Sequence, residues 1–317
     1  MKVVLDKVTK KYDLDTLGVE DIDIVAENCV YGIIGEEGSG KSTVLRFIGG
    51  IVDADGGELT FDGKVMNSVP PESRDVVLVE GKSPLGGSVK RVLSYGLKLR
   101  RFPRAEISRR VDEAAELFGF SGRLDVNVKT LDAEDTLRLG LARAAARRSK
   151  VVVIDEPYAR VREESRASLY ADIVRLAKHN EGVVFVASSN GADAGYTGDI
   201  ISVMRNGRII RTGGFAEVTE DPRSAYVARF AGEMPMNILR TDDGVFAVRA
   251  DMVRLTEGDH EVVGVSEREG GSVVALLVSE NEPPFIIYAD GRVPEKGMKA
   301  GYEILGKIRL TDESVEK

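Results

Sequence analysis

The amino-acid sequence predicts an α/β domain over residues 1–235, followed by a small all-β domain over residues 236–317. In the first part, short β-rich runs alternate with long helical stretches, and one buried apolar run leads straight into a glycine-rich loop. Beyond Asn237, strand-like runs separated by Gly, Pro, Asn or Asp dominate, as in a small barrel or sandwich. These runs are Gly244–Val248, Glu261–Ser266, Ser272–Ser279, Phe285–Tyr288 and Glu303–Leu310. Turns such as Glu269–Gly271 and Asp290–Gly291 separate them, and we place the boundary near Glu233–Asn237.

Length and composition agree with two soluble domains. The chain has 317 residues, of which 43% are hydrophobic and 30% charged, so it can bury a sizeable core. No apolar run approaches the ~20 residues that a membrane-spanning helix needs. The N-terminal Met1–Val4 lacks the apolar core of a signal peptide. The net charge of −8 disfavours a general nucleic-acid-binding surface, and −6 of it falls in residues 236–317, which supports the domain boundary.

Cysteine and histidine are too scarce for several kinds of site. Cys29 is the single cysteine, which excludes an internal disulfide framework and a cysteine-based zinc site. Two histidines, His179 and His260, leave little room for a histidine-ligated metal. We therefore expect a reducing, cytosolic environment.

The strongest chemical signal is a phosphate-binding loop. Val30–Ile34 has the pattern of a buried strand, and a helical run, Val44–Ile48, follows the loop. The segment between them matches G-x-x-x-x-G-K-[ST] in the strand–loop–helix context that this motif requires. Backbone N–H groups of such a loop face phosphate oxygens, Lys41 can reach the terminal phosphates, and the Ser42 hydroxyl can bind Mg²⁺. The predicted nucleotide-binding residues are Gly35, Glu36, Glu37, Gly38, Ser39, Gly40, Lys41, Ser42 and Thr43.

A second motif places two carboxylates after a buried strand. Val151–Ile154 consists of four β-branched residues, the pattern of a parallel strand buried on both faces. Asp155 then lies at the carboxyl end of the strand, where a parallel sheet presents its ligands, and can orient Mg²⁺. Glu156 follows it, placed to polarise a water molecule. The alternative is that the two carboxylates cap the next helix. The phosphate loop upstream makes this alternative less favoured.

The order of these motifs resembles the ATP-binding subunits of ABC transporters. The resemblance extends over nearly the whole chain and implies a P-loop NTPase core with a helical subdomain at about residues 81–147. The tail resembles the sugar-, polyamine- and anion-importer subgroup, in which an OB-like (TOBE) regulatory domain follows the core. The segments that carry the likeness are Val8–Tyr12, Gly57–Gly63, Pro70–Val79, Leu137–Ala144, Phe215–Pro222, Tyr226–Gly232, Pro235–Asn237 and Val248–Asp251.

The resemblance also implies roles for particular residues. It implies ATP and Mg²⁺ as cofactors, Glu156 as the catalytic carboxylate, and Tyr12 as the aromatic platform that stacks on adenine. An ordinary strand tyrosine is the alternative for Tyr12. Glu80 occupies the position of the Q-loop glutamine and is expected to join Ser42 and Asp155 as a Mg²⁺ ligand.

Four family motifs are altered. Glu80 replaces the Q-loop glutamine, Arg162 replaces the D-loop aspartate, and Ser188 replaces the switch histidine. The signature LSGGQ reads Leu131, Asp132, Ala133, Glu134 and Asp135. In the family, signature N–H groups of one subunit donate to the γ-phosphate held by the other, so these acids bring like charge toward the nucleotide unless a cation or a turned-away loop relieves it. We expect hydrolysis to be weak or partner-dependent.

Three functional classes remain open at this point. The first is the ATPase subunit of an importer, peripheral on the inner face of the cell membrane, that drives uptake of a small solute through membrane-spanning subunits. Its second ATPase subunit is another copy of this chain or an intact partner. The second class is a nucleotide-binding regulatory or structural ABC protein without useful turnover, and the third an unrelated P-loop enzyme. The transported solute cannot be read from this chain.

Overall fold

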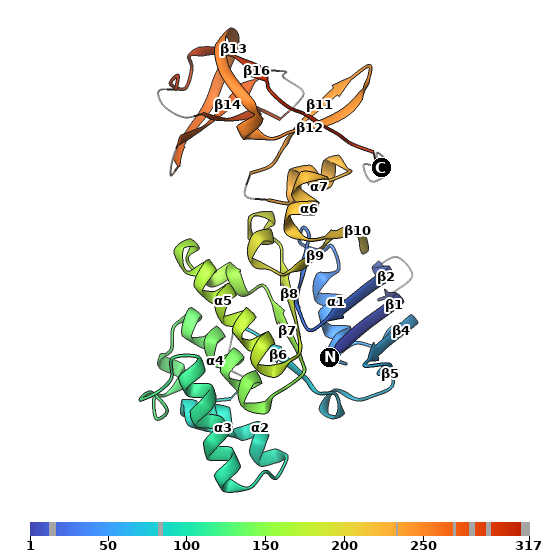
Figure 1. The fold of residues 1–317 in the computed structure, drawn as a ribbon, viewed down its shortest axis with the longest axis vertical. Coiled ribbons are helices and arrows are strands. Elements are labelled where there is room, and N and C mark those ends of the chain that lie inside the picture. Colours follow the sequence, from blue (N-terminus) through green and yellow to red (C-terminus); the bar gives the residue numbers. More distant parts are fainter. Residues whose placement is uncertain are drawn as a thin grey trace. The chain divides into compact units, whose positions relative to one another are not determined.

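The computed structural model describes residues 1–12, 17–81, 85–232, 234–268, 271–278, 283–289 and 293–311. The chain forms two compact units, Met1–Phe215 and Ala216–Lys317, and each is described by itself. Figure 1 shows the helices and strands of both.

Two β-sheets and five α-helices, with short 3-10 turns between them, build the described part of the first unit. Its strands are β1 (Lys2–Lys11), β2 (Leu17–Glu27), β3 (Val30–Ile34), β4 (Gly56–Phe61), β5 (Lys64–Val65), β6 (Val76–Val79), β7 (Val151–Asp155), β8 (Val183–Ser188), β9 (Ile200–Arg205) and β10 (Arg208–Gly213). Its helices are α1 (Lys41–Ile48), α2 (Val89–Leu99), α3 (Arg104–Leu117), α4 (Ala133–Arg147) and α5 (Glu163–Asn180). The α/β prediction for this part of the chain is confirmed, and the predicted strand Val30–Ile34 is β3.

The larger sheet is buried on both faces. Its order is β10-β9-β3-β8-β7-β6, with parallel pairing from β9 to β6 and an antiparallel β10 at one edge. Alternate residues of a strand point to opposite faces, so Val152 and Ile154 pack with helices α2 to α5, whereas Val151 and Val153 pack with α1. This explains why β7 is apolar at four successive positions.

The smaller sheet covers the outer side of α1. Its order is β2-β1-β4-β5, all antiparallel. Val44, Leu45, Phe47 and Ile48 of α1 form one core with residues of β1, β2, β4 and the larger sheet (Figure 1). Helix α1 is thus held between two sheets, which fixes the segment that precedes it, the phosphate loop.

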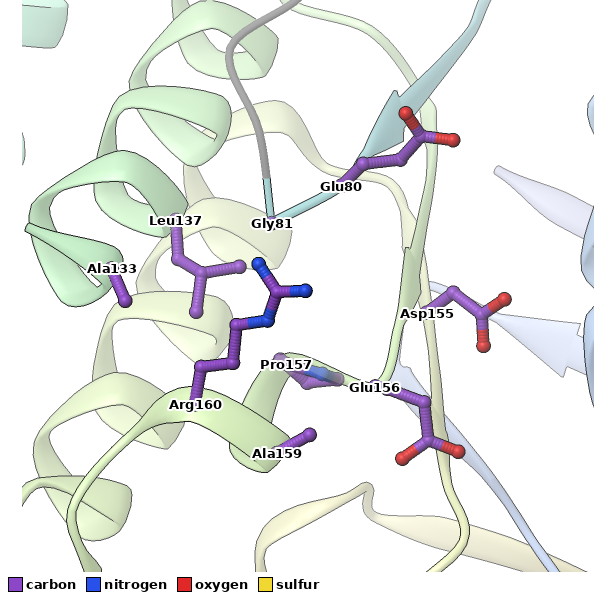
Figure 2. Close-up of a pocket in the computed structure, with 9 residues that line it drawn as sticks. All are labelled: Glu80, Gly81, Ala133, Leu137, Asp155, Glu156, Pro157, Ala159 and Arg160. Carbon is purple, nitrogen blue, oxygen red and sulfur yellow. The ribbon is translucent and has the colours of Figure 1, made fainter. Parts of the chain in front are cut away.

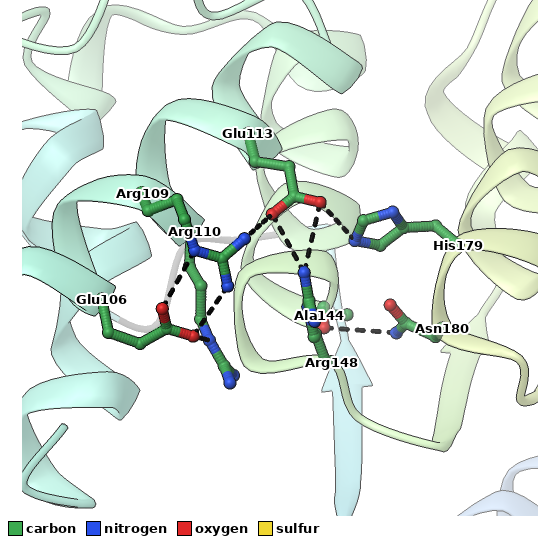
Figure 3. A network of polar contacts seen from close by, with 8 residues as sticks. All are labelled: Glu106, Arg109, Arg110, Glu113, Ala144, Arg148, His179 and Asn180. Atoms are coloured by element: carbon green, nitrogen blue, oxygen red, sulfur yellow. Dashed lines mark hydrogen bonds and ion pairs between the residues drawn. The ribbon is translucent and has the colours of Figure 1, made fainter.

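A polar network joins helices α3, α4 and α5 (Figure 3). Glu113 of α3 accepts hydrogen bonds from Arg109 at 3.3 Å and from Arg148, just after α4, at 3.2 Å. His179 of α5 lies 4.0 Å from the same carboxylate. Asn180 donates to the carbonyls of Ala144 and Ser149. These contacts fasten the C-terminal ends of α4 and α5 to each other and to α3.

We predict that His179 makes the stability of the protein fall in mild acid. Burial lowers the pKa of His179, and Arg148 adds to this, while Glu113 opposes it. The folded protein therefore takes up this proton at lower pH than the unfolded chain, whose histidine titrates near pH 6.5. The contribution of neutral His179 to the stability of the folded protein is present above pH ~6.5 and is lost as the pH falls through the pKa of His179 in the folded state. Denaturant midpoints between pH 7.5 and 5.5 should fall less steeply for His179→Gln than for the wild type, and equal slopes would contradict this.

The second unit is mostly antiparallel β-structure. It contains α6 (Phe215–Glu220), which starts at the last residue of the first unit, and α7 (Ala225–Phe230). Its strands are β11 (Asn237–Thr241), β12 (Gly244–Val248), β13 (Val253–Arg268), β14 (Gly271–Leu277), β15 (Phe285–Ala289), β16 (Lys299–Ile304) and β17 (Ile308–Arg309). They form a three-stranded sheet, β11-β12-β17, and a four-stranded sheet, β15-β14-β13-β16.

Several predicted strands of the tail are confirmed, and others are corrected. Gly244–Val248 is β12 and Phe285–Tyr288 lies within β15. The long β13 begins eight residues before the predicted Glu261, and β11 was missed. The single strand predicted for Glu303–Leu310 is wrong, because the chain leaves β16 at Ile304 and β17 pairs with β12 in the other sheet. Residues 269–270 and 290–291 of the predicted turns lie outside the described residues.

The boundary between the two units, after Phe215, lies about 20 residues before the one expected from composition. Ala225 and Ala228 of α7 share a core with Met236, Val245 and Ala247 of the β-rich part. Helix α7 therefore packs with the second unit, although its sequence pattern continues that of the first.

None of the helices in the described ranges is both long and apolar enough to cross a membrane.

Candidate nucleotide site

The phosphate loop connects β3 to α1, as predicted. Two of its glycines are required by close packing. A Cβ on Gly35 would lie 2.3 Å from the carbonyl oxygen of Met204, and a Cβ on Gly40 would lie 2.7 Å from that of Gly18. Gly40 also has a φ of 103°, which strongly favours glycine. The loop can therefore turn sharply into the N-terminus of α1, where backbone N–H groups favour an anion.

Lys41 lies inside this loop rather than on the surface. Its side chain is buried, and Nζ donates to the carbonyls of Gly35 at 2.8 Å and Glu36 at 2.9 Å. Burial lowers the pKa of Lys41, while the nearby carboxylates of Glu156, Asp155 and Glu37 oppose that shift. The Lys41 ammonium group is thus held where phosphate oxygens would meet the loop.

Asp155 has a carboxylate oxygen that receives no hydrogen bond from the described part of the protein. It is the last residue of β7, and its Oδ1 atom is buried with no hydrogen-bond partner in the described part of the chain. An unpaired buried carboxylate oxygen is costly, so a cation bound there would stabilise it. Ser42, in the first turn of α1, adds a hydroxyl of the kind that Mg²⁺ accepts.

The protein groups by themselves do not form a complete metal cage. No cluster of three or more His, Cys, Asp or Glu side chains among the described residues could hold an ion. Mg²⁺ usually keeps several waters and binds through one or two protein groups plus substrate phosphates. The donor set of Ser42 and Asp155 fits that pattern.

Glu156 is held in an unusual backbone conformation. Its φ is 52°, in the left-handed region that non-glycine residues seldom adopt, and its N–H donates to the Ala187 carbonyl at 3.0 Å. The carboxylate accepts hydrogen bonds from the N–H and the hydroxyl of Ser189 and lies 4.0 Å from Lys41 Nζ. Such conformations persist where the surroundings determine them, often at functional sites.

A cavity of about 360 Å³ opens beside these carboxylates (Figure 2). Glu80, Asp155 and Glu156 line one side of it, and Glu80 is exposed. Arg160 reaches into the cavity toward Gly81 from the opposite side, next to Ala133 and Leu137 of α4. Glu80 thus lies in the neighbourhood predicted for it, and its role as a Mg²⁺ ligand stays a prediction.

Comparison with known proteins identifies the family to which this chain belongs. A family model described as "ABC transporter" matches residues 23–159. The sn-glycerol-3-phosphate import ATP-binding protein UgpC of Rhodopseudomonas palustris is 30% identical over 249 residues, which cover 77% of this chain and 68% of that protein. This chain belongs to the ABC transporter family.

Other relatives and one solved structure agree with this assignment. The oligosaccharides import ATP-binding protein MsmX of Bacillus subtilis is 29% identical, over 82% of this chain and 72% of that protein. The spermidine/putrescine import ATP-binding protein PotA of Nitratidesulfovibrio vulgaris is 32% identical, over 75% of this chain and 64% of that protein. The structure of cbiO1 from Clostridium perfringens, part of the ABC transporter complex cbiONQ, shares the fold with a TM-score of 0.64 at 23% identity, over 72% of this chain and 92% of that one.

In this ABC protein, Tyr12 lies directly beside the phosphate-loop helix. Its hydroxyl is 3.2 Å from the Thr43 hydroxyl, and its ring lies so close to Gly18 that a Cβ there would come within 2.9 Å of it. The side chain is still 49% exposed, which leaves ring surface free for a ligand. The role of Tyr12 as the adenine platform stays a prediction.

We predict that Tyr12→Ala weakens binding of MgATP and MgADP by similar factors of about tenfold or more. Stacking of a base on an aromatic side chain contributes ~1–3 kcal/mol, and the base is common to both nucleotides. Tyr12→Phe keeps the ring and loses only the contact with Thr43, so it should bind nearly as the wild type does. Calorimetry with both nucleotides tests this, and a loss confined to ATP would show that the ring does not contact the base.

The acids at the signature position of this ABC protein are paired within the chain. Asp132 is the N-cap of α4 and accepts a hydrogen bond from the Asp135 N–H at 2.8 Å. Glu134 forms an ion pair with Arg138 at 2.8 Å, and Asp135 binds Arg123. Two cations therefore offset the charge that the sequence places here, and Ala133 faces the cavity of Figure 2.

The D-loop and switch positions have different surroundings. Arg162 is exposed, lies 3.7 Å from Glu164 and precedes α5 without a side-chain cap. Ser188 is buried, and its hydroxyl donates to Asp193 at 2.7 Å. The serine hydroxyl that donates to Glu156 is that of the next residue, Ser189, which the sequence interpretation missed. The available signal was the position of Ser189 just beyond a strand that neighbours β7, where parallel strands present functional groups.

Proposed function

We propose that this chain is the ATP-binding subunit of an ABC importer, which couples ATP binding and hydrolysis to uptake of a small solute through separate membrane-spanning subunits. One observation carries the proposal: the complete phosphate loop places buried Lys41 4.0 Å from Glu156, whose neighbour Asp155 has a carboxylate oxygen without a hydrogen-bond partner among the described residues. The relatives named above as import ATP-binding proteins support the direction of transport. Such a subunit lies at the inner face of the cell membrane.

Each residue of the nucleotide site has its own role in ATP binding and hydrolysis. The loop N–H groups and Lys41 bind the phosphates, and Tyr12 holds the base. Ser42, Asp155 and Glu80 would hold Mg²⁺, and the bound ion would supply positive charge that neutralises the phosphates. Glu156 accepts the proton of the attacking water, since its carboxylate stands at the sheet edge beside Lys41.

ATPase activity of the purified protein, alone and with the cognate membrane subunits, tests this proposal. We expect MgATP to bind in both cases and turnover to rise when the membrane subunits are present. Glu156→Gln should abolish turnover while it leaves MgATP binding intact. Binding without turnover in the assembled transporter would favour a regulatory or structural ABC protein instead.

We further propose that residues 236–317 form the OB-like (TOBE) regulatory domain of the importer subgroup. The antiparallel sheets β11-β12-β17 and β15-β14-β13-β16 support it. Val262, Val274, Leu276 and Ile287 are fully buried in the larger of the two. An independent core of this kind is what a separate domain needs.

The altered signature leads to a prediction about subunit association. We expect MgATP to leave the Glu156→Gln protein mostly monomeric, because the signature loop offers acidic side chains where the family offers N–H and hydroxyl donors to the γ-phosphate. Arg123 and Arg138 offset the charge of Asp135 and Glu134, but they do not replace those donors.

A restored signature provides the matched comparison. The changes are Asp132→Ser, Ala133→Gly, Glu134→Gly and Asp135→Gln in the Glu156→Gln background. Serine is as good an N-cap as aspartate, so α4 should keep its start. Sedimentation with MgATP should show a dimer for the restored protein only. Equally tight dimers of both proteins would mean that the acidic signature is functional.

A further inference from the structure

We propose that the second unit carries a binding site for a small apolar carboxylic acid. The site is a cavity of about 280 Å³, and all the described residues that line it belong to this unit. The inference is independent of the proposed function, because none of these residues is part of the nucleotide site. Pockets for small molecules have volumes of ~300–1,000 Å³, so a cavity near the lower end of that range suits a compact ligand.

Two strands from different sheets, and the segments beside them, build a mostly apolar wall. Ile238 and Leu239 come from β11, and Phe285 comes from β15. Val278 directly follows β14, and Pro283–Pro284 directly precede β15. Proline has no backbone N–H, so this part of the wall offers no donor to a polar ligand. The wall therefore favours a ligand whose body is hydrocarbon.

A buried side-chain amide fixes the shape of this cavity. Asn237, the first residue of β11, donates to the Ile286 carbonyl at 2.7 Å and accepts the Ile286 N–H at 2.6 Å. Its Nδ2 atom also donates to the Val248 carbonyl at 3.3 Å. Asn237 thus joins the two sheets, and both N–H bonds of its amide are already used. A ligand would enter a cavity that is formed in advance, which lowers the cost of binding.

Arg229 is the only charged residue among the described residues that line the cavity. It lies on α7, and the Met236 N–H donates to the Ala228 carbonyl at 3.0 Å, which holds this helix against the start of the wall. Arg229 is exposed and forms no ion pair or hydrogen bond with another described residue. Its guanidinium can therefore bind a planar anion through two parallel hydrogen bonds.

The balance of charge selects a carboxylate. One guanidinium balances one carboxylate, whereas a phosphate dianion would leave excess charge beside apolar side chains. Tyr302 also lines the cavity, with its ring stacked on Phe285 at 4.5 Å between centroids, and its hydroxyl makes no hydrogen bond to a described residue. That hydroxyl is a second donor that a carboxylate can accept. Arg229 would repel an amine, and a sugar would leave hydroxyl groups unpaired against the wall.

Calorimetry with the full-length protein tests the site. The probes are 3-phenylpropionate, 4-methylpentanoate and hexanoate, each compared with its neutral amide, and 3-phenylpropylamine as a cation. We expect at least one acid to bind with a Kd of about 1 mM or tighter. Its amide should bind about tenfold more weakly, because it lacks the charge-assisted hydrogen bonds to Arg229. The amine should not bind.

Arg229→Gln removes the charge and keeps a polar side chain. Binding of the acid should weaken about tenfold while binding of the amide stays the same, so that this variant no longer distinguishes them. Its melting temperature should stay near that of the wild type, since an exposed side chain without a described partner is lost. Arg254→Gln is the matched control. Arg254 is exposed on β13, pairs with Glu303 at 3.2 Å and does not line the cavity, so this variant should bind the acid as wild type does.

Lys41→Ala separates this cavity from the phosphate loop, where an anion can also bind. Lys41→Ala should bind the acid as wild type does, and Arg229→Gln should bind MgATP as wild type does. Loss of acid binding in Lys41→Ala would assign the acid to the phosphate loop and overturn the proposal. Equal affinities for acid and amide, wild-type affinity of Arg229→Gln for the acid, or no binding of any probe at about 10 mM would also overturn it. Each of these results leaves the proposed function standing.

Discussion

Replacing Lys41 by alanine should lower the affinity for MgATP about 100-fold. A hydrogen bond that involves charged groups contributes roughly 1.5–3 kcal/mol, and Lys41 can make more than one to the terminal phosphates. The ammonium is already inside the loop, with bonds to the carbonyls of Gly35 and Glu36. Little rearrangement is therefore needed for it to meet a phosphate. Its removal would also break the 4.0 Å contact with Glu156.

Calorimetry with MgATP measures this effect directly. Lys10→Ala is the matched control, because Lys10 forms an ion pair with Asp55 at 3.2 Å away from the loop and should bind MgATP as wild type does. A melting curve of Lys41→Ala is also needed, since the lost bonds help to shape the loop itself. If a folded Lys41→Ala protein binds MgATP with wild-type affinity, the phosphates do not lie in this loop.

Replacing Arg74 by alanine should cost roughly 4 kcal/mol of stability, the largest effect that we expect outside the nucleotide site. Arg74 is only 2% exposed. Its guanidinium donates to the carbonyls of Phe47 and Ile48 at the end of α1, and to those of Met66, Asn67 and Val69. Burial lowers the pKa of Arg74, and Asp53 opposes the shift. The negative end of the α1 dipole helps to stabilise this buried cation.

The loss would have two sources. Alanine leaves several carbonyl groups without their donor. It also leaves a cavity where the guanidinium packs against Gly50, so closely that a Cβ added there would lie 2.8 Å from Cζ. The melting temperature of the unit should fall by roughly 10 °C. Arg74→Lys keeps the charge and loses the planar fork, so its melting temperature should lie between those of the wild type and Arg74→Ala.

Arg100→Ala is the matched control for Arg74. Arg100 is exposed and pairs with Asp75 at 3.2 Å, so its removal should change stability by less than ~1 kcal/mol. Thermal and denaturant unfolding compare the three variants. Equal, small losses for Arg74→Ala and Arg100→Ala would mean that the buried contacts of Arg74 carry no net stabilisation.

Local pattern was enough to predict the segments that carry the phosphate loop and the two carboxylates. Val30–Ile34 is apolar throughout, and glycines follow it at fixed positions, so strand, loop and helix are all set within about 20 residues. The strand at Val151–Ile154 is equally predictable from local pattern, because a strand buried on both faces needs apolar residues at every position. In the tail, the pattern located strands but missed β11 and mistook β16 and β17 for one strand. Which sheet a short strand joins is decided by pairing with distant residues.

The sequence by itself determined the fold class, the phosphate loop with Lys41, and Asp155 and Glu156 at the end of a buried strand. Only the tertiary structure showed that Ser189, rather than Ser188, holds Glu156, that Arg74 is buried against the end of α1, and that Arg123 pairs with Asp135. A motif is readable when neighbouring residues share one element, because backbone geometry then sets their spacing. A polar side chain tells nothing by itself about its partner, since that partner lies on another strand or helix, and the order of strands in the sheet brings the two together.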